Sequence, residues 1–459
     1  MALAWKFVMR CLTKVLPLAC AMTIIFFSFH SANAQDTKVM LSDTVITALE
    51  YSPQLDVLQN NESAITHERD RAYGGYYPAV DLTFGYGAEA HSDEFTRSEQ
   101  SGDIDHNFYD RLEASIRLSQ LIYDGKETKS LVGIEDAKLD SAGFRTFDNA
   151  EAIALDAIIA HFEVNRQRQL VALAEQNVQD HQNILGDLQE RQEGGAGSIA
   201  DVDQTQARLA RAFASLAETE GGLRAAEANY MRIVGKLPGD LENYFVPKEF
   251  VPTSLESAIE ATLQNNPKIK ALGANVVEAE QRVELSRSGF LPKAYAELSS
   301  SYEDQVESSE TYEQNNQAML RLRWNLFNGG SDIADRKASS ARKMQAIASR
   351  KDQMDVVVEE TRATWAELDA SRKQVVAFGD AVTYNQKTLD SYIKQFNVGQ
   401  RTLLDVLDAR NELFQSSGLL VTAQANEVIA IERLLALSGQ LTKSLQIDEH
   451  IYMVQQESN

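Results

Sequence analysis

The chain contains two copies of one pattern of turn residues, and this duplication restricts its fold more than any other feature. Pro53 and Pro78 recur 214 positions later as Pro267 and Pro292. Later turn residues recur 204 positions on, with Asp124-Gly125, Gly195, Asp201-Val202, Gly235 and Leu237 matching Asn328-Gly329, Gly399, Asp405-Val406, Gly439 and Leu441. Copies of this size are too long for solenoid repeats. We therefore expect two structural repeats that build one pseudo-symmetric body.

The offset between the copies changes once, between Pro78 and Asp124. In that interval the first copy carries a polar, acidic loop from Ser92 to His106, which the second copy shortens to roughly Asp304 to Asn315. Each repeat is therefore expected to have one tip of variable length.

The first 34 residues have the composition of a secretory signal peptide. Lys6, Arg10 and Lys14 precede an apolar run from Val15 to Phe29, and Ser31-Ala32-Asn33-Ala34 then supplies an Ala-x-Ala cleavage site. We therefore expect a signal peptide over residues 1–34 and a mature chain outside the cytoplasm.

Both cysteines, Cys11 and Cys20, lie in this segment. Lipid attachment at Cys20 is an alternative, although Pro17-Leu18-Ala19-Cys20 is a poor lipobox. Cleavage after Ala34 would leave a mature chain without disulfide or thiol chemistry, so its stability must come from packing.

The net charge of the chain argues against partners that are themselves acidic. The formal net charge is −23, and removal of the three basic residues of the signal peptide makes it −26. Such a chain is unsuited to binding nucleic acid or anionic lipid.

After Phe29 no run of apolar residues approaches the length of roughly 18 that a membrane-spanning helix needs. Insertion into a membrane would therefore require β-strands.

Long helices are predicted where proline is absent, over residues 79–237 and 293–459. Apolar residues recur at helical spacing along a narrow, coiled-coil-like seam from about 125 to 191 and from about 331 to 395. Some 65 residues at a rise of about 1.5 Å form a rod of about 100 Å. Shorter helices are predicted at about 42–73 and 255–288, interrupted at Pro53 and Pro267.

Each rod is predicted to end in a glycine turn and to return as a second helix. The turns contain Gly195 and Gly197 in the first copy and Gly399 in the second, and Ser198 and Thr402 are suited to cap the returning helices. The returning helices should span about 199–234 and 403–438. The predicted organisation is a first repeat at 35–237, a linker at 238–252, a second repeat at 253–445 and a polar tail at 446–459.

Segments of alternating polarity precede both rods and predict strand pairs at about 79–123 and 293–327. Val80, Leu82, Phe84 and Tyr86 alternate with polar residues, as do Leu320 and Leu322 with Arg321 and Arg323. One apolar and one charged face is typical of the wall of a membrane barrel. A soluble two-sided sheet remains the alternative for each strand alone.

Four strands cannot close a barrel, and an open edge in lipid leaves backbone groups unpaired. Two copies would give eight strands, a barrel filled by its own side chains. Three copies would give twelve strands, the smallest number that leaves a conduit. Four copies are not excluded by physics alone.

The most specific stretch runs from Gly399 to Ala409 and reads Gly-Gln-Arg-Thr-Leu-Leu-Asp-Val-Leu-Asp-Ala. It matches the Gly-x-Arg-Thr-x-x-Asp-Val-Leu-Asp-Ala motif of the TolC family of outer membrane channel-tunnels. Supporting matches are Asn266-Pro267, Phe290-Leu291-Pro292 and Leu326-Phe327-Asn328-Gly329-Gly330. The chain resembles this family over essentially its whole mature length.

The resemblance implies a mostly α-helical homotrimer with a twelve-stranded transmembrane β-barrel, continued by an α-helical coiled-coil tunnel in the periplasm. It also implies partners, namely a periplasmic adaptor (membrane fusion protein) and an inner-membrane transporter. The barrel would lie in the lipid of a Gram-negative outer membrane.

For the hairpin tips, the resemblance implies that Asp405 and Asp408 form acidic rings at the pore aperture. It implies that Arg401 with Asp201 links neighbouring hairpins and keeps the aperture closed. Phe396 departs from the pattern, because the family usually has a tyrosine whose hydroxyl joins these links. The closed state is therefore expected to be weaker by one hydrogen bond, about 1 kcal/mol.

The spacing of the acids agrees with this role, because Asp405 and Asp408 are three positions apart and share one helix face. Threefold symmetry would give two rings of three carboxylates, which attract cations. The alternative for Asp405 is an acid that interacts with the dipole at a helix N-terminus. The alternative for Arg401 is a solvated turn residue.

No catalytic, cofactor or metal site is expected. Residues 194–197 lack the Gly-Lys-Ser/Thr of a phosphate loop, and the histidines have no metal-ligand spacing. The sequence favours an outer membrane exit duct without enzyme activity. A non-conducting periplasmic scaffold is the rival, but it would need no amphipathic strands.

Two kinds of export remain open for a duct. The runs at 226–237 and 401–407 look more like the type I secretion branch of the family, which favours protein secretion with an ABC-type transporter. Multidrug or small-molecule efflux with an RND-type transporter is the alternative.

Overall fold

The computed structural model of the chain describes residues 38–91, 107–195, 197–243, 247, 250–304 and 312–452. The predicted signal peptide with both cysteines, the acidic loop at 92–106 and most of the shorter loop at 304–315 lie outside the described residues.

The two repeats contain the same order of elements. The first consists of α1 (Leu41–Tyr51), α2 (Pro53–Tyr73), η2 (Gly74–Tyr76), β1 (Ala79–His91), β2 (Asn107–Tyr123), α4 (Glu127–Glu193) and α5 (Ile199–Val234). The second consists of α6 (Leu255–Asn265), α7 (Pro267–Ser288), β3 (Lys293–Asp304), β4 (Tyr312–Arg323), α8 (Ser331–Asn397) and α9 (Leu403–Leu437), followed by α10 (Leu441–Ser444) and η3 (Glu449–Ile451). Apart from short 3-10 turns, each repeat is thus two helices, two strands and a long helical hairpin.

The predicted prolines begin helices rather than break them. Pro53 and Pro267 each occupy the first turn of their helices, α2 and α7, where the missing N–H has no partner to lose. The Asn266 side chain caps α7 by accepting the Ile269 N–H at 3.0 Å. The breaks between α1 and α2 and between α6 and α7 therefore follow from the sequence.

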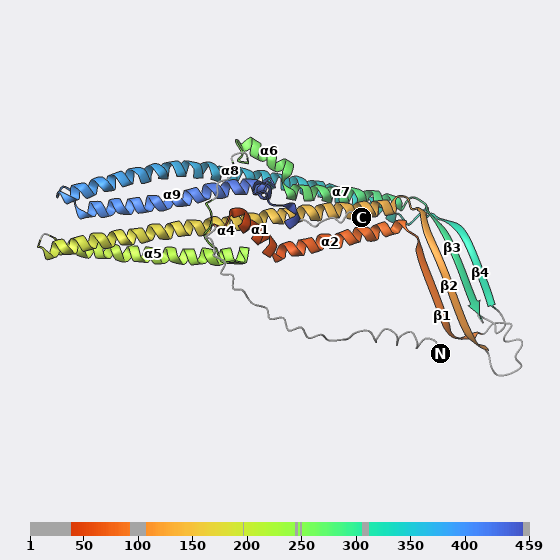
Figure 1. Cartoon of the computed structure of the whole chain (residues 1–459). Coiled ribbons are helices and arrows are strands. Elements are labelled where there is room, and N and C mark those ends of the chain that lie inside the picture. Colours follow the sequence, from red (N-terminus) through yellow and green to blue (C-terminus); the bar gives the residue numbers. More distant parts are fainter. Residues whose placement is uncertain are drawn as a thin grey trace, which may run out of the picture. The chain divides into compact units, whose positions relative to one another are not determined.

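The long helices α4 and α8 have 67 residues each. Each packs against its returning helix, α5 or α9, and α4 also packs against α9. The two hairpins lie side by side (Figure 1). Many of the buried positions on α4 are alanines, such as Ala150, Ala154 and Ala157, and small side chains allow close helix packing.

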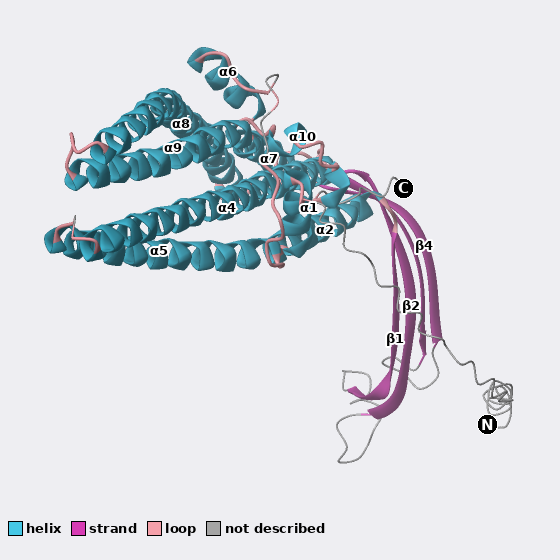
Figure 2. Cartoon of the chain, turned by 60° about the vertical axis from the view of Figure 1, so that its left-hand side comes forward, coloured by secondary structure: helices cyan, strands magenta, loops and turns pink. Residues whose placement is uncertain are grey.

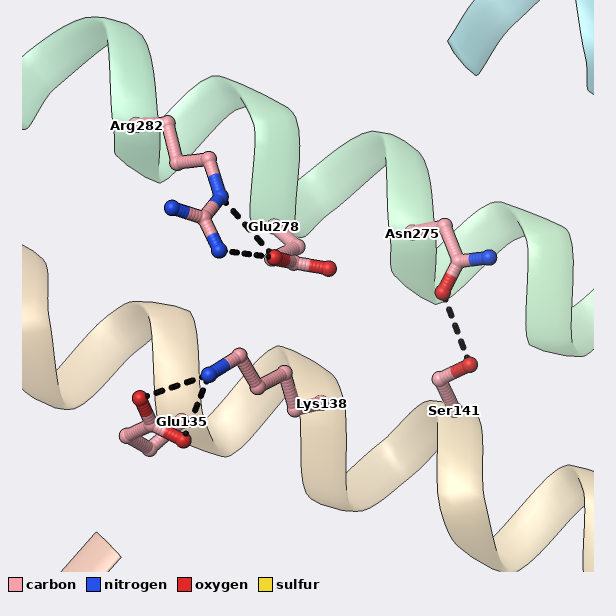
Figure 3. A network of polar contacts seen from close by, with 6 residues as sticks. All are labelled: Glu135, Lys138, Ser141, Asn275, Glu278 and Arg282. Carbon is pink, nitrogen blue, oxygen red and sulfur yellow. Dashed lines mark hydrogen bonds and ion pairs between the residues drawn. The ribbon is translucent and has the colours of Figure 1, made fainter. Parts of the chain in front are cut away.

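Helix α7 joins the two repeats by packing against both α4 and α8. The Ser141 hydroxyl of α4 donates to Asn275 Oδ1 of α7 at 2.8 Å (Figure 3). The nearby ion pairs Lys138–Glu135 and Arg282–Glu278 stay within one helix each. Toward α8, Glu280 of α7 forms an ion pair with Lys343 at 3.1 Å. Polar contacts therefore join α7 to the long helices of both repeats.

The four strands form one antiparallel sheet in the order β1-β2-β3-β4 (Figure 1), which is drawn in magenta in Figure 2. Pairing of β2 with β3 joins the strand pairs of the two repeats, with one register shift between Leu121 and Tyr123. Strands β1 and β4 pair on one side only. Within the described residues, the outer edges of both strands therefore have no ladder partner.

The register gives this sheet one apolar and one charged face, because opposed residues in antiparallel strands point to the same side. One face carries the rows Val80-Leu118-Leu298-Ala318 and Phe84-Ala114-Tyr302-Gln314. The other face carries the rows Asp81-Arg117-Ser299-Gln317 and Gly85-Glu113-Glu303-Glu313. On the apolar face, Leu82 and Leu320 are 77% and 74% exposed. A single chain thus leaves a large apolar surface uncovered.

The last strand differs from the prediction, which placed a loop at roughly 304–315 and the end of the second strand pair at about 327. Strand β4 begins at Tyr312 because the polar residues that follow pair with β3 in unbroken register. It ends at Arg323, and the Trp324 indole N–H then donates to the Phe290 carbonyl at 3.1 Å. The alternation of apolar residues alone could not show the polar half of this strand.

The main core lies where α1, α4, α5 and the C-terminal segment meet. A polar tail from position 446 was predicted, but Ile447 and Tyr452 are 6% and 2% exposed. The Tyr452 ring stacks on Phe147 of α4. Ile447 and Tyr452 therefore anchor a segment whose other residues are mostly polar. The rest of the predicted tail, residues 453–459, lies outside the described residues.

Membrane-spanning helices were not expected after the signal peptide. Among the helices that the structure describes, none has a stretch both apolar and long enough to cross a bilayer.

The core contains two acids that the sequence did not single out, Glu151 of α4 and Glu432 of α9. The Glu151 carboxylate accepts the backbone N–H groups of Leu441 and Thr442 at 2.9 and 3.0 Å and the Thr442 hydroxyl at 2.6 Å. Glu432 is fully buried, and neither carboxyl oxygen has a hydrogen-bond partner in the described part of the chain. Burial raises the pKa of Glu151 to about 7. Burial, with the nearby Glu151, raises the pKa of Glu432 to about 8.

We predict that the folded chain loses stability as pH rises from about 4.5 to about 8. An acid whose pKa is raised on folding binds more protons in the folded than in the unfolded state, so deprotonation opposes folding. Each tenfold difference in proton affinity between the two states corresponds to about 1.4 kcal/mol. Glu432→Gln should therefore raise the melting temperature at pH 8.5 and flatten its pH dependence. Thermal unfolding followed by circular dichroism measures both.

The control is Glu412→Gln, an exposed acid on the same helix. It should leave the pH dependence as in the wild type. A Glu432→Gln protein with wild-type pH dependence would show that Glu432 is not the titrating group.

Candidate functional site at the hairpin turns

The turns of the two hairpins hold all the predicted site residues. Gly195 and Gly399 both have φ of +77°, a left-handed conformation that glycine adopts without strain. At Gly197 a Cβ atom would come within 2.7 Å of the Gln192 backbone nitrogen. These three glycines are therefore explained by the geometry of the turns.

Both returning helices begin with a hydroxyl cap, as predicted. The Ser198 hydroxyl accepts the Ala200 N–H at 3.2 Å. Thr402 and Asp405 form a capping box, in which Thr402 Oγ1 accepts the Asp405 N–H at 3.3 Å and the Asp405 carboxylate accepts the Thr402 N–H at 3.1 Å. The Thr402 hydroxyl also donates to this carboxylate at 2.7 Å.

The Thr402 hydroxyl is the main reason why the pKa of Asp405 is lowered from its usual value. Asp405 therefore stays ionised as a first-turn acid of α9. The alternative interpretation of Asp405, as an acid at a helix N-terminus, is confirmed for the single chain. A second role at a pore aperture stays a prediction.

Arg401 makes its contacts within the second hairpin. Its guanidinium lies 4.2 Å from the centre of the Tyr392 ring, and its Nε donates to Gln395 Oε1 at 3.0 Å. Its Nη1 is 3.7 Å from Asp405 Oδ1. In the described part of the single chain no bond joins Arg401 to Asp201. A link between them stays a prediction for neighbouring subunits.

Asp201 is the equivalent of Asp405 in the first repeat, because it is the third residue of α5. Its backbone carbonyl accepts the Thr205 hydroxyl at 2.8 Å. Its side chain is partly exposed. The acid therefore remains accessible to a partner outside its own helix.

Asp408 forms an ion pair with the other repeat. Arg208 of α5 donates from Nη2 to Asp408 Oδ1 at 2.7 Å, with side-chain exposures of 25% and 56%. The sequence predicted Asp408 as a pore acid but did not identify Arg208.

Phe396 also contacts the other repeat. Its ring packs with Leu188 of α4 and Leu403 of α9, and the Arg191 guanidinium lies 5.3 Å from the ring centre. A cation–π contact contributes roughly 0.5–1 kcal/mol at exposed sites, similar to one hydrogen bond. The phenylalanine therefore has a stabilising contact of its own, and a weaker closed state stays a prediction.

A further ion pair between the hairpins joins Arg410 of α9 to Asp180 of α4. Its side chains are only 18% and 20% exposed. Together with the contacts of Arg191 and Arg208, it shows that three arginines fasten one hairpin to the other near the turns.

The sequence contains a signal for these contacts, which lies in departures from the duplication. At the offset of 204, Asp180, Arg191, Arg208, Asp408 and Arg410 correspond to Tyr384, Gln395, Glu412, Gln204 and Gln206. A charge that the other copy lacks or reverses cannot be required by the shared hairpin fold. Such charges are therefore candidates for contacts between the unlike repeats.

Metal ligation is not indicated at this site. In the described residues, no three His, Cys, Asp or Glu side chains gather in a way that could hold a metal ion. The chemistry that the turns offer is electrostatic, namely exposed acids and the arginines that pair with them.

The chain is similar to known proteins in both sequence and fold. The family model for outer membrane efflux proteins matches residues 45–236 and 258–440, one segment in each repeat. Outer membrane efflux protein BepC of Brucella suis is 28% identical over 332 residues, which covers 71% of this chain and 72% of BepC. Alkaline protease secretion protein AprF of Pseudomonas aeruginosa is 23% identical over 438 residues, which covers 92% of this chain and 89% of AprF.

Among solved structures, the CmeC outer membrane channel of Campylobacter jejuni has a TM-score of 0.74 at 12% identity. The match covers 87% of this chain and 86% of the CmeC chain. At this identity the likeness concerns the fold, which is therefore the same in both proteins.

We predict that Asp180→Asn loosens both hairpin turns. Removing one partner of a mostly buried ion pair leaves Arg410 uncompensated and costs about 1–3 kcal/mol. Amide hydrogen exchange of the segments beside the turns should accelerate by about tenfold, the factor for 1.4 kcal/mol.

The control is Glu220→Gln. Glu220 forms its ion pair with Arg224, which lies on the same helix, α5, and is well exposed, so this pair does not join the two hairpins. This variant should leave exchange at the turns unchanged. Equal exchange in Asp180→Asn and the wild type would mean that the pair does not hold the hairpins together.

Proposed function

Because this chain belongs to the outer membrane efflux protein family, we propose that it is the outer membrane exit duct of a tripartite exporter. The protein lies in the outer membrane, with a large periplasmic part. In the proposed complex, an inner-membrane transporter and a periplasmic adaptor deliver the substrate. The duct conducts it passively to the exterior.

The sheet carries this proposal. It has one apolar, exposed face and two edges without partners in the described residues. In lipid each unpaired backbone group costs several kcal/mol, so β1 of one copy must pair with β4 of the next. The apolar face then meets lipid, and the charged face lines a water-filled interior.

Three copies give the smallest assembly with an open interior. Two copies would form an eight-stranded barrel that side chains fill, whereas twelve strands leave a conduit. The helical hairpins of three copies would continue this conduit as a coiled-coil tunnel into the periplasm. A homotrimer also agrees with the closed cyclic symmetry common among oligomers.

At the periplasmic end, the hairpin turns are proposed to form the aperture. Asp405 and Asp408 would contribute acids around the pore, and Arg401 with Asp201 would link neighbouring subunits in the closed state. The exposure of these side chains and the position of all four near the turns support this arrangement.

For the cargo, we favour type I protein secretion with an ABC-type transporter. The match to AprF, described as an alkaline protease secretion protein, extends over more of this chain than the match to BepC. BepC is described as an efflux protein and is more similar in identity. Small-molecule efflux with an RND-type transporter is therefore the second candidate.

We predict that deletion of the gene removes one or more proteins from the culture medium and that the intact gene restores them. Quantitative comparison of the secreted proteins checks this. If the deletion strain secretes the same proteins but is more susceptible to small toxic compounds, the function is efflux rather than protein secretion.

We predict that the purified protein is a trimer that gives discrete conductance steps in planar bilayers. Native mass determination and single-channel recording on the same sample test the two parts of this statement. Material that stays monomeric and passes no ions would contradict the duct.

We predict that Arg401→Ser raises the resting conductance of the channel. Loss of a link of about 1 kcal/mol shifts a closed–open equilibrium by about fivefold. The comparison is Arg224→Ser, an exposed arginine whose ion pair lies within α5. Equal single-channel conductance in Arg401→Ser and the wild type would remove Arg401 from the aperture.

A further inference from the structure

Arg208 and Asp408 are brought together from different repeats. Arg208 is on α5 and Asp408 on α9, and Nη2 lies 2.7 Å from Oδ1. In the part of the chain that the structure describes, the Asp408 carboxylate has no other hydrogen bond or ion pair. Asp408 is 56% exposed, so its charge faces solvent on one side and Arg208 on the other.

The other proposed aperture acid also has a basic neighbour. Asp405 is held by Thr402, and Arg401 lies 3.7 Å from it. Each of the two proposed aperture acids therefore has an arginine of its own subunit beside it. In a trimer the six carboxylates of Asp405 and Asp408 would each have such a guanidinium neighbour rather than form two uncompensated acidic rings.

The Arg208–Asp408 pair is particular to one interface between the repeats. At the offset of 204, Arg208 corresponds to Glu412 and Asp408 to Gln204. A pair between these equivalent positions would join Gln204 to Glu412, and neither side chain is a cation. Arg208 is therefore not required by the hairpin fold that both repeats share.

We propose that Arg208 determines how the aperture responds to cations, by occupying Asp408 within each subunit. This inference rests on the proposed duct, because the turns must surround a conducting pore. An ion pair at this distance presents a small dipole to a passing ion, whereas a free carboxylate presents a full charge. Arg208 is thus a specificity-determining residue that acts through Asp408 and keeps multivalent cations from binding the acids.

The test is block of the current by La³⁺ in planar bilayers, on the full-length protein. Arg208→Gln frees the carboxylates and should lower the half-blocking concentration by at least about fivefold. Arg208→Lys keeps the positive charge and should block as the wild type does. Arg211→Gln removes the same charge one turn along α5, where the described residues give no ion pair, and should also match the wild type.

Asp408 must be the group through which Arg208 acts, which a double-mutant cycle tests. The double variant Arg208→Gln/Asp408→Asn carries no net charge at the two positions, as the wild-type ion pair does, so its half-blocking concentration should return to within about twofold of the wild type. A double variant that is blocked as readily as Arg208→Gln alone, or no change in Arg208→Gln, would overturn the inference.

Asp408→Asn alone gives a second test that needs no change at Arg208. It leaves Arg208 as an unpaired cation beside the aperture, so the half-blocking concentration should rise. An unchanged or lower half-blocking concentration would mean that the pair does not lie at the aperture, against the inference. Wild-type protein that conducts nothing would defeat the proposed duct and this inference together, whereas a conducting wild type with unchanged Arg208→Gln defeats this inference alone.

Discussion

Hydrogen bonding at two sheet edges is the constraint on which the rest of this architecture depends. Strands β1 and β4 each pair on one side, and the sheet between them has an apolar and a charged face. An apolar face without cover favours lipid, but lipid does not tolerate open edges. Only pairing with further copies satisfies both conditions. A closed oligomer follows from this requirement, and the proposed trimer is the smallest one that also leaves an aqueous interior.

The long hairpins connect the sheet to the hairpin turns, which lie some 67 residues away along α4 and α8. Their fold is set by properties that both repeats share: helices without internal proline, glycine turns and hydroxyl caps. Their mutual contacts are set by residues that differ between the repeats. Arg208 and Arg410 each pair with an acid of the other hairpin. The features that both repeats share thus determine the fold of each hairpin, and residues that differ between the repeats hold the two hairpins together.

Much of this fold was predictable, because the duplication, the prolines and the period of apolar residues are local signals. The returning helix at 199–234 and the capping of both returning helices were predicted as observed. The first half of β4 was missed because its residues are polar and show no apolar alternation. The buried tail residue Tyr452 was missed because its partner Phe147 is distant in sequence. At the turns, the sequence and its resemblance singled out Asp405, Asp408 and Arg401 as candidates. They did not single out Arg191, Arg208 and Arg410, which contact the other hairpin. Pairing between repeats depends on three-dimensional proximity, which no periodicity within one helix can show.

Disulfide cross-linking measures whether the β1 edge of one copy pairs with the β4 edge of another. The chain has no cysteine after Cys20, so cysteines can be introduced on the charged face at Asp81, Thr83 or Gly85 of β1. Each is combined with one at Glu313, Asn315 or Gln317 of β4, because the register between copies is open. We expect that at least one combination, oxidised in membranes, gives a ladder of linked species that ends at three chains. Only unlinked chains in every combination, or a ladder that ends at two, would contradict it.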